Sequence, residues 1–284
     1  MTPRPIILLV DPAHFDVSYV INPWMRPGAW AADPAGHQAG ARASFEALKA
    51  ALTAAGAAVE TIPGVPGQPD MVFPANAAVI LDGRAIVARF ACAERRGEEQ
   101  PYYAALQGYV ARGMLDEVAI FSEGCFQEGA GDAIWDATRQ LFWCGYGQRS
   151  VLRATEELRA FFGKDLVALE LATDRFYHLD TCFCPLSGGE VLFYPPAFTA
   201  DALAKIHAHV PPEKRLEASK EDAAAFCVNA VNIGRNVVMA RAPAHVRGLL
   251  TDHGYKVVDV DLDPFILSGG GAYCMTLRLD RRSV

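Results

Sequence analysis

A theme that recurs about every 50 residues constrains the fold of this chain more than any other feature. An aromatic residue is followed within three positions by a polar residue, and a β-rich run comes next. The aromatic positions of the five copies are Phe73, Phe126, Tyr177, Phe226 and Tyr273, so successive copies lie 53, 51, 49 and 47 residues apart. A period of about 50 residues is typical of a propeller or another closed array.

Strand and helix patterns alternate along the chain. The two most similar copies, Phe73-x-x-Asn76-Ala and Phe226-x-x-Asn229-Ala, lead into predicted strands at Arg84–Arg89 and Asn236–Arg241. Helical spacing of apolar residues lies between the strand clusters, at Ala43–Ala55, Tyr102–Arg112, Ala154–Phe162, Ala200–His209 and Ala244–His253. These patterns predict a five-fold pseudosymmetric α/β propeller of ββαβ-type repeats. A conventional α/β sheet with evenly spaced units remains the alternative at this stage.

Length and composition limit the other possibilities. A chain of 284 residues allows one large domain or two, and five units plus an N-terminal strand favour a single domain over residues 1–284. The 51% of hydrophobic residues excludes disorder, and a net charge of −7 without a long Lys/Arg run argues against nucleic acid as a partner. The early apolar run Ile6–Val10 is too short for a membrane span or a signal peptide. We expect a cytoplasmic protein without a membrane partner, and a homo-oligomer stays open.

Cysteine usage points to one residue. The seven cysteines are odd in number and scattered, so free thiols are expected. Cys274 alone follows a glycine run, Ser268-Gly-Gly-Gly271, and such a run lets backbone amides and a substrate approach closely. A nucleophilic cysteine needs its pKa lowered from about 8.5, most simply by a nearby cation. A lone cysteine after a turn is, in the alternative, an ordinary core residue.

The repeat would direct several polar side chains toward its central axis. These are Asn76, Glu128, Asp132, His178, Asp180 and Cys274. His178 could transfer protons, and Asp180 lies two residues further along a predicted strand, where it would share a face with His178 and orient it. The acids Glu128 and Asp132 could face a cationic substrate. Together these residues predict an acidic pocket with a thiol nucleophile, although His178 could also be a core histidine.

Metal and dinucleotide sites are poorly supported. His178 with Cys182 and Cys184 could bind zinc, but the chain lacks the second ligand pair that such sites use. Gly129-Ala-Gly131 lacks the third glycine of a dinucleotide fingerprint. We therefore expect no cofactor.

With these residues assembled, the chain resembles the guanidino-group-modifying enzymes, the pentein superfamily. The resemblance runs through four ordered segments, residues 69–76, 126–129, 178–180 and 268–274. That superfamily shares a five-fold α/β propeller and includes arginine deiminases, dimethylarginine hydrolases, amidinotransferases and arginine dihydrolases. The resemblance implies that Cys274 is the nucleophile, His178 the general acid/base and Glu128 the carboxylate that grips guanidinium nitrogens. Asp180 is similar to the acid two residues beyond the family's histidine.

The same resemblance suggests groups for the amino-acid end of the substrate. Asp70 matches a position near the substrate's amino group. Arg95 and Arg149 resemble arginines that bind the α-carboxylate, which suits the planar fork of a guanidinium. In the alternative, Arg95 is a solvated surface charge.

Asn76 separates the subfamilies. Deiminases and dimethylarginine hydrolases usually carry Asp there, whereas arginine dihydrolases resemble this chain at that position and share the element Tyr19–Met25 with Asn22. An amide offers a donor and an acceptor, so it would let a neutral urea group remain and react. The resemblance thus implies an arginine dihydrolase that forms a covalent thiouronium and releases ornithine, carbon dioxide and ammonia. A dimethylarginine hydrolase, a deiminase, an amidinotransferase and a non-catalytic ribosome-binding relative are the alternatives.

Overall fold

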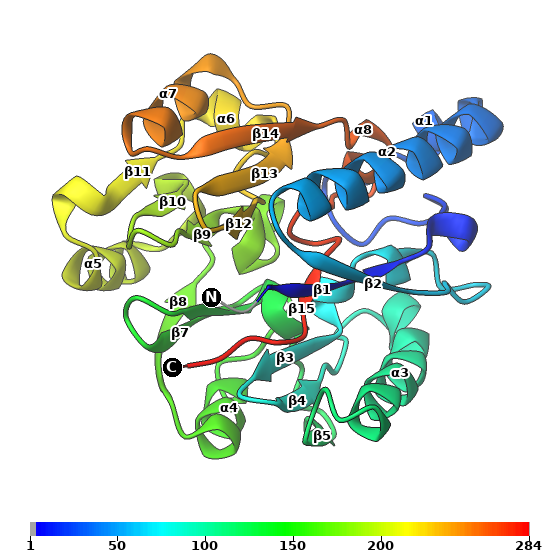
Figure 1. Ribbon diagram of the computed structural model, residues 1–284, viewed down its shortest axis with the longest axis horizontal. Coiled ribbons are helices and arrows are strands. Elements are labelled where there is room, and N and C mark those ends of the chain that lie inside the picture. Colours follow the sequence, from blue (N-terminus) through cyan, green and yellow to red (C-terminus); the bar gives the residue numbers. More distant parts are fainter. Residues whose placement is uncertain (1–3, 284) are drawn as a thin grey trace.

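The computed structural model describes residues 4–283, and their strands form five three-stranded sheets arranged about a common centre (Figure 1). The sheets are β15 (Leu277–Arg278) with β1 (Ile6–Val10) and β2 (Ala58–Ile62); β3 (Ala78–Leu81), β4 (Arg84–Val87) and β5 (Glu117–Ile120); β6 (Ala133–Asp136), β7 (Leu141–Tyr146) and β8 (Asp165–Glu170); β9 (Phe183–Pro185), β10 (Val191–Phe193) and β11 (Arg215–Glu217); and β12 (Val231–Ile233), β13 (Asn236–Ala240) and β14 (Lys256–Val260).

Every sheet has the same internal order. Its first strand pairs antiparallel with the middle strand, and the middle strand pairs parallel with the third. A parallel pair needs a crossover, which a helix supplies in each unit. The helices are α1 (Pro27–Ala32), α2 (Pro34–Ala54), α3 (Glu99–Ala111), α4 (Ala154–Phe162), α5 (Ala200–His209), α6 (Lys220–Ala224), α7 (Ala244–Asp252) and α8 (Asp263–Ile266). The predicted ββαβ repeat is confirmed.

The helix boundaries follow from caps and apolar faces. Helices α4 and α5 have the predicted ends, and α4 buries Leu158 and Phe162 before Gly163 closes it in a left-handed conformation at φ 63°. Helix α2 begins nine residues before the predicted start. The Asp33 side chain accepts a hydrogen bond from the Gly36 backbone and Pro34 occupies the first turn, so the true start lies upstream of the apolar pattern.

A short turn before each first strand carries the polar residue of the repeat. Three of these turns are 3-10 helices, Pro74–Asn76, Gly129–Gly131 and Leu179–Thr181, which lead into β3, β6 and β9. The first strands are the innermost ones, so the turns meet at one end of the central axis. The last strand, β15, pairs with β1, and this pairing brings the segment after Cys274 into the same arrangement.

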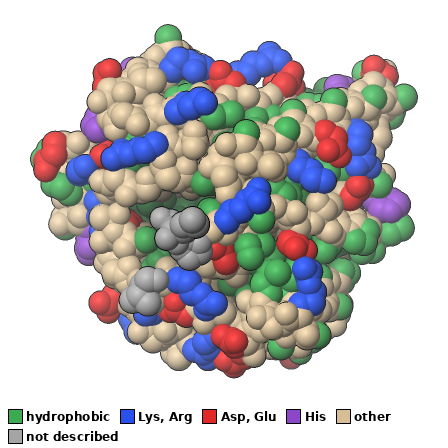
Figure 2. Space-filling view, in the orientation of Figure 1, with side chains coloured by type: hydrophobic (Ala, Val, Ile, Leu, Met, Phe, Trp, Pro, Cys, Tyr) green, Lys and Arg blue, Asp and Glu red, His purple; other side chains and the backbone are tan. Residues whose placement is uncertain are grey.

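Two properties of the surface bear on partners. No helix within residues 4–283 is long and apolar enough to cross a membrane. On the face shown in Figure 2, basic side chains lie among acidic ones rather than in one continuous stripe.

Candidate active site

Cys274 is buried, with 2% of its surface exposed, and it is held by two side chains. Its Sγ lies 3.2 Å from Asp180 Oδ2 and 3.0 Å from Asn229 Nδ2. Asn229 Oδ1 also accepts hydrogen bonds from the backbone N–H groups of Tyr273 (2.9 Å) and Cys274 (3.2 Å). Asn229 therefore fixes both the main chain and the sulfur of Cys274.

The glycine run before Cys274 packs against other parts of the protein. A Cβ added to Gly270 would collide with the Phe73 ring, and one added to Gly271 would lie 2.8 Å from Asn229 Oδ1 and from the Phe226 ring. The run is therefore needed, as predicted, for close approach, and the neighbours in the described structure are aromatic rings and the Asn229 amide.

The electrostatic surroundings of Cys274 differ from the expectation. Burial, and then the negative charge of Asp180, raise the pKa of the Cys274 thiol well above its ordinary value. A nearby protein cation was expected, but the Sγ partners are a carboxyl group and an amide. Among the described residues, no cationic side chain is hydrogen-bonded to the Cys274 sulfur.

Asp180 is buried beside the sulfur. Burial raises its pKa to about 7, although hydrogen bonds from Cys274 and Asn229 oppose this shift. Its Oδ2 contacts Cys274, and its Oδ1 has no hydrogen-bond partner in the described chain. The expectation that Asp180 lies along a strand and orients His178 is wrong, because residues 179–181 form a 3-10 turn that directs Asp180 to Cys274.

Glu128 orients His178 instead. His178 Nε2 lies 2.7 Å from Glu128 Oε2, which also accepts from Arg149 at 3.1 Å, and Glu128 Oε1 accepts from the Ala91 backbone at 3.0 Å. Burial acts to raise the pKa of Glu128, but the charge of Arg149 and the hydrogen bond to His178 outweigh it and lower the pKa. Glu128 is thus an ionised partner that holds the imidazole in place.

Asp132 lies behind the site rather than facing a substrate. Its Oδ2 accepts from Ser150 Oγ at 2.6 Å and its Oδ1 accepts from the Leu179 backbone at 2.9 Å. Ser150 Oγ in turn accepts from the Glu128 backbone. Burial raises the pKa of Asp132 to about 6. Asp132 and Ser150 therefore position the two turns that carry Glu128 and His178.

Asn76 lies between Arg95 and His178. Its Oδ1 accepts from Arg95 at 2.9 Å, and its Nδ2 lies 3.4 Å from His178 Nδ1. A Cβ on Gly131 would collide with Asn76 Nδ2 and lie 3.5 Å from Asp180 Oδ2. Only glycine at position 131 leaves room for the Asn76 amide and the Asp180 carboxyl to approach each other.

Arg95 is buried, with 3% of its surface exposed, so it is not a solvated surface charge. Its Nε and one terminal nitrogen each lie 2.8 Å from an oxygen of Glu98, and its guanidinium lies 4.5 Å from the centre of the Phe90 ring. The fork that would bind a substrate carboxylate is occupied by Glu98. The geometry supports a different role for Arg95, which is to hold the Asn76 amide.

Two of the remaining predicted residues, Asn22 and Arg149, line an opening near this network. A cavity of about 430 Å³ is lined by Val20, Ile21, Asn22, Pro23, Gln148, Arg149, Asp174 and Tyr177. Arg149 connects it to the site, because one terminal nitrogen contacts Glu128 and the other donates to the Ile21 carbonyl at 2.6 Å.

Asn22 and Asp70 both contact the segment at Ser268. Asn22 Nδ2 donates to the Ser268 carbonyl, and its Oδ1 accepts from the Trp24 backbone. Asp70 accepts from Tyr19 Oη at 2.9 Å and from Ser268 Oγ at 3.0 Å. Neither side chain is hydrogen-bonded to Cys274 or His178. Asn22 and Asp70 therefore lie outside the contacts that join Cys274 to Asp180 and His178 to Glu128 and Asn76.

Sequence reasoning placed Asn229 in the repeat but missed its place in the site. The signal was present, since Phe226-x-x-Asn229-Ala matches Phe73-x-x-Asn76-Ala. The thiols of Cys182 and Cys184, considered as zinc ligands, donate to backbone carbonyls of Leu179 and Ala230. Among residues 4–283, no three His, Cys, Asp or Glu side chains are grouped to hold a metal ion.

Comparison with known families gives the site a context. Residues 18–281 match the model of the eukaryotic N,N-dimethylarginine dimethylhydrolase family. The chain belongs to this family. The match covers all the site residues described above and confirms the resemblance to guanidino-modifying enzymes.

Relatives within and around the dimethylarginine dimethylhydrolase family have more than one activity. The chain is 38% identical over 276 residues to the bifunctional arginine dihydrolase/ornithine cyclodeaminase ArgZ of Synechocystis sp.; the alignment covers 96% of this chain and 37% of ArgZ. It is 35% identical to an N(G),N(G)-dimethylarginine dimethylaminohydrolase of Mycobacterium tuberculosis, with 95% of this chain and 84% of the relative covered. The chain thus spans little more than a third of the bifunctional relative.

Solved structures agree with the fold. The N-terminal domain of ArgZ, an arginine dihydrolase from cyanobacteria, has a TM-score of 0.90 and 36% identity, with 99% of this chain and 100% of that one covered; it is a cysteine-to-serine variant bound to substrate. In a second structure of that domain, with TM-score 0.90 and 36% identity, an asparagine-to-serine variant is covalently bonded to a reaction intermediate, with 99% of each chain covered.

Proposed function

We propose that this chain is a hydrolase that cleaves guanidino C–N bonds of arginine through a covalent Cys274 intermediate, and that it acts as an arginine dihydrolase. The observation that carries the proposal is one buried network in which Cys274 contacts Asp180, His178 contacts Glu128, and Asn76 lies between them. The similarity to the ArgZ domain supports it. We propose that the five sheets act as one catalytic unit. The free state of all seven cysteines supports a reducing, cytoplasmic location.

The first step uses the charge of the substrate. A guanidinium bound between Asp180 and Glu128 places a cation beside the Cys274 sulfur, and this offsets the effects that raise the pKa of the thiol. The sulfur then attacks the central carbon. The thiol proton reaches the departing nitrogen through His178, so ammonia leaves and an S-alkylthiouronium remains on Cys274.

Water completes the first round. His178, held by Glu128, takes a proton from a water molecule that attacks the thiouronium carbon. The C–S bond breaks, Cys274 recovers its proton and citrulline forms. In the second round, Cys274 attacks the ureido carbon and a second ammonia leaves. Water then releases a carbamate, which decomposes to carbon dioxide and ornithine.

Asn76 favours the second round. A carboxylate at position 76 would stabilise a guanidinium but repel the carbonyl oxygen of a ureido group. The Asn76 amide presents a donor through Nδ2, whose contacts to His178 Nδ1 and to the Glu128 carbonyl are both long at 3.4 Å. A ureido oxygen can therefore take that donor in place of these weak contacts.

Hydrolysis of dimethylarginine is the second candidate, because the Mycobacterium tuberculosis relative with that activity covers 95% of this chain. The two functions differ in products. Incubation with arginine, dimethylarginine and citrulline, followed by measurement of ammonia, dimethylamine, citrulline and ornithine, separates them. Ornithine with two ammonia molecules per arginine supports the proposal, whereas citrulline with dimethylamine from dimethylarginine contradicts it.

A further inference from the structure

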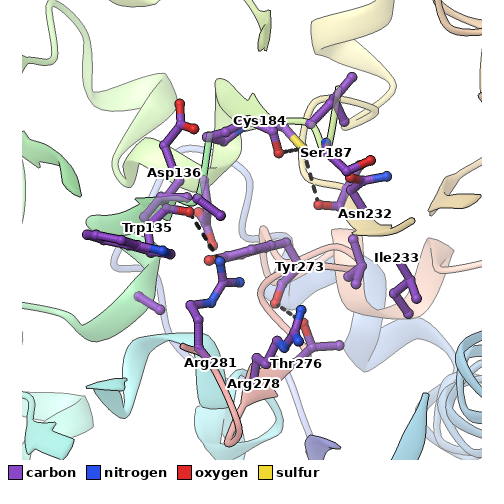
Figure 3. Close-up of a pocket in the computed structure, with 18 of the residues that line it drawn as sticks. Trp135, Asp136, Cys184, Ser187, Asn232, Ile233, Tyr273, Thr276, Arg278 and Arg281 are labelled. Atoms are coloured by element: carbon purple, nitrogen blue, oxygen red, sulfur yellow. Dashed lines mark hydrogen bonds between the residues drawn. The ribbon is translucent and has the colours of Figure 1, made fainter. Parts of the chain in front are cut away.

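A second cavity, of about 410 Å³, is lined by residues from all five sheets, which places it on their common axis; Figure 3 shows part of its lining. The site residues precede the innermost strands β3, β6, β9, β12 and β15, whereas most of the residues that line this cavity lie within those strands or just after them. The cavity and the candidate active site are therefore at opposite ends of the axis. Asp180 and Tyr273 reach the cavity from the catalytic end.

Arg281 gives this cavity an uncompensated positive charge. Within residues 4–283 no carboxylate lies within ion-pair distance of Arg281, and the one hydrogen bond of its guanidinium goes from a terminal nitrogen to the Trp135 carbonyl at 3.1 Å. Its neighbour Arg278 is paired with Asp280 at 3.0 Å. Figure 3 shows the hydroxyl end of Tyr273 beside the Arg281 guanidinium. Burial lowers the pKa of Arg281, which reflects the cost of a cation without a counter-charge.

Two of the residues that line the cavity carry a further polar atom without a partner. Trp135 Nε1, on a side chain that is 3% exposed, and Asp180 Oδ1, on one that is 1% exposed, have no hydrogen-bond partner in the described residues. Both residues line the cavity. Most of the remaining wall is apolar and includes Ile134, Phe142, Phe183, Val231 and Ile233. Apolar walls with a few convergent polar groups are typical of a ligand site.

We propose that this axial cavity binds a small organic monoanion, a carboxylate on an aromatic or branched apolar body. The carboxylate pairs with Arg281, whose planar fork suits two carboxylate oxygens, and the Tyr273 hydroxyl donates to it. The apolar body fills the space between the innermost strands. Because Tyr273 precedes Cys274 and Asp180 contacts its sulfur, the bound anion lies directly behind the nucleophile. This site does not depend on the proposed reaction.

Calorimetric titration with 3-phenylpropionate tests the site, with 3-phenylpropan-1-ol as its uncharged analogue. We expect one site per chain for the anion and at least tenfold weaker binding of the alcohol, because hydrogen bonds to a charged group are the stronger ones. Arg281→Gln should weaken the anion at least tenfold. Arg282→Gln, a change at the exposed neighbouring residue, is the matched control and should leave the affinity unchanged.

Three results would overturn the site: no binding to the unmodified chain, equal binding by the Arg281→Gln variant, or displacement by saturating arginine in a Cys274→Ala background, which would place the anion at the catalytic end. If Arg281→Gln does not fold, Ile233→Trp provides the second test. The indole would fill the cavity, so it should abolish anion binding while arginine still binds the Cys274→Ala background. Anion binding that survives this substitution contradicts the proposal.

Discussion

Asn76 and Asn229 occupy equivalent positions in two repeats, but their hydrogen bonds differ in partners and in length. Each follows a Phe-x-x-Asn-Ala motif, each is buried, and each lies just before an innermost strand, β3 or β12. Asn229 makes bonds of 2.9 to 3.2 Å to the segment that carries Cys274. Asn76 Oδ1 is held by Arg95, and its Nδ2 has contacts of 3.4 Å.

The difference follows from what the neighbouring repeat presents. Asn229 meets a glycine-containing backbone and a thiol, and its Oδ1 and Nδ2 hold them, while Nδ2 also donates to the Asp180 carbonyl at 3.1 Å. Asn76 meets His178 and a buried arginine, which leave its amide donor weakly engaged. The repeat thus sets where a polar side chain lies, and its neighbour sets whether it clamps the protein or remains available to a substrate.

The largest expected effect concerns the nucleophile on the Asn229 side. Cys274→Ala should lower arginine turnover by at least about 10⁴-fold, because the proposed covalent adduct forms on the Cys274 sulfur. The melting temperature should stay close to that of the unmodified protein. Cys227→Ala, which removes a buried thiol bonded to the backbone, is the control and should keep its activity. Substantial turnover by Cys274→Ala would place the nucleophile elsewhere.

Asp180→Asn, next to Cys274, should change how the stability of the protein depends on pH. A carboxyl with an ordinary pKa of 3.8 and a folded-state pKa of about 7 carries no penalty well below pH 3.8, where both the folded and the unfolded states are protonated. As pH rises to 7, the unfolded state loses its proton first, so the penalty grows to as much as about 4 kcal/mol, about three pKa units. The variant should therefore gain unfolding free energy over the unmodified protein as pH rises.

Urea unfolding at pH 4.5 and pH 8 measures this difference. The exposed Asp165→Asn is the control, with no expected change in the difference between the two pH values. The lowered pKa of Glu128 has the opposite sign: its ion pair with Arg149 stabilises the fold above its ordinary pKa, and this contribution is lost as pH falls. An Asp180→Asn variant without a pH-dependent gain would mean that the carboxyl is not destabilising.

Asn229→Ala tests the clamp. The backbone N–H groups of Tyr273 and Cys274 lose their acceptor, at a cost of about 1–3 kcal/mol for each buried group. We expect about a 100-fold fall in kcat and a lower melting temperature. Asn229→Asp keeps the acceptor for the two backbone N–H groups, so it should recover the stability that Asn229→Ala loses. It lacks the donor to the Cys274 Sγ, so it should not recover the rate at which iodoacetamide alkylates Cys274. Equal behaviour of the two variants would argue against a clamp.

Much of the fold could be predicted from the sequence because the repeat is encoded locally. Apolar periodicity gave α4 and α5 their ends, and the aromatic spacing gave five units. The start of α2 was missed because its signals, Asp33 and Pro34, lie outside the apolar stripe. Periodicity detects buried faces, so a helix segment that is largely exposed leaves no such signal.

The sequence predicted which residues meet in the site better than it predicted which side chains contact each other. Asn76, Glu128 and Cys274 meet His178 and Asp180 because the five residues lie in the equivalent turns of four repeats, and His178 and Asp180 share one turn. Which groups touch depends on the 3-10 turn at Leu179–Thr181, which rotates Asp180 from His178 to Cys274. The burial of Arg95 depends on Glu98, a pairing three residues away that equally suits an exposed turn. One sequence does not determine such rotations.

Asn76→Asp changes the charge of the site and leaves its size the same, so it isolates the role that distinguishes Asn76 from Asn229. The carboxylate can still accept from Arg95, and it should hold a guanidinium at least as well as the amide does. It cannot donate to a ureido oxygen, so the second round should slow. We expect about a tenfold higher ratio of citrulline to ornithine, with arginine consumption within tenfold of the unmodified protein. Citrulline supplied as the substrate should react more slowly than arginine in this variant. An unchanged product ratio would mean that the Asn76 amide, like that of Asn229, serves only to hold the protein in place.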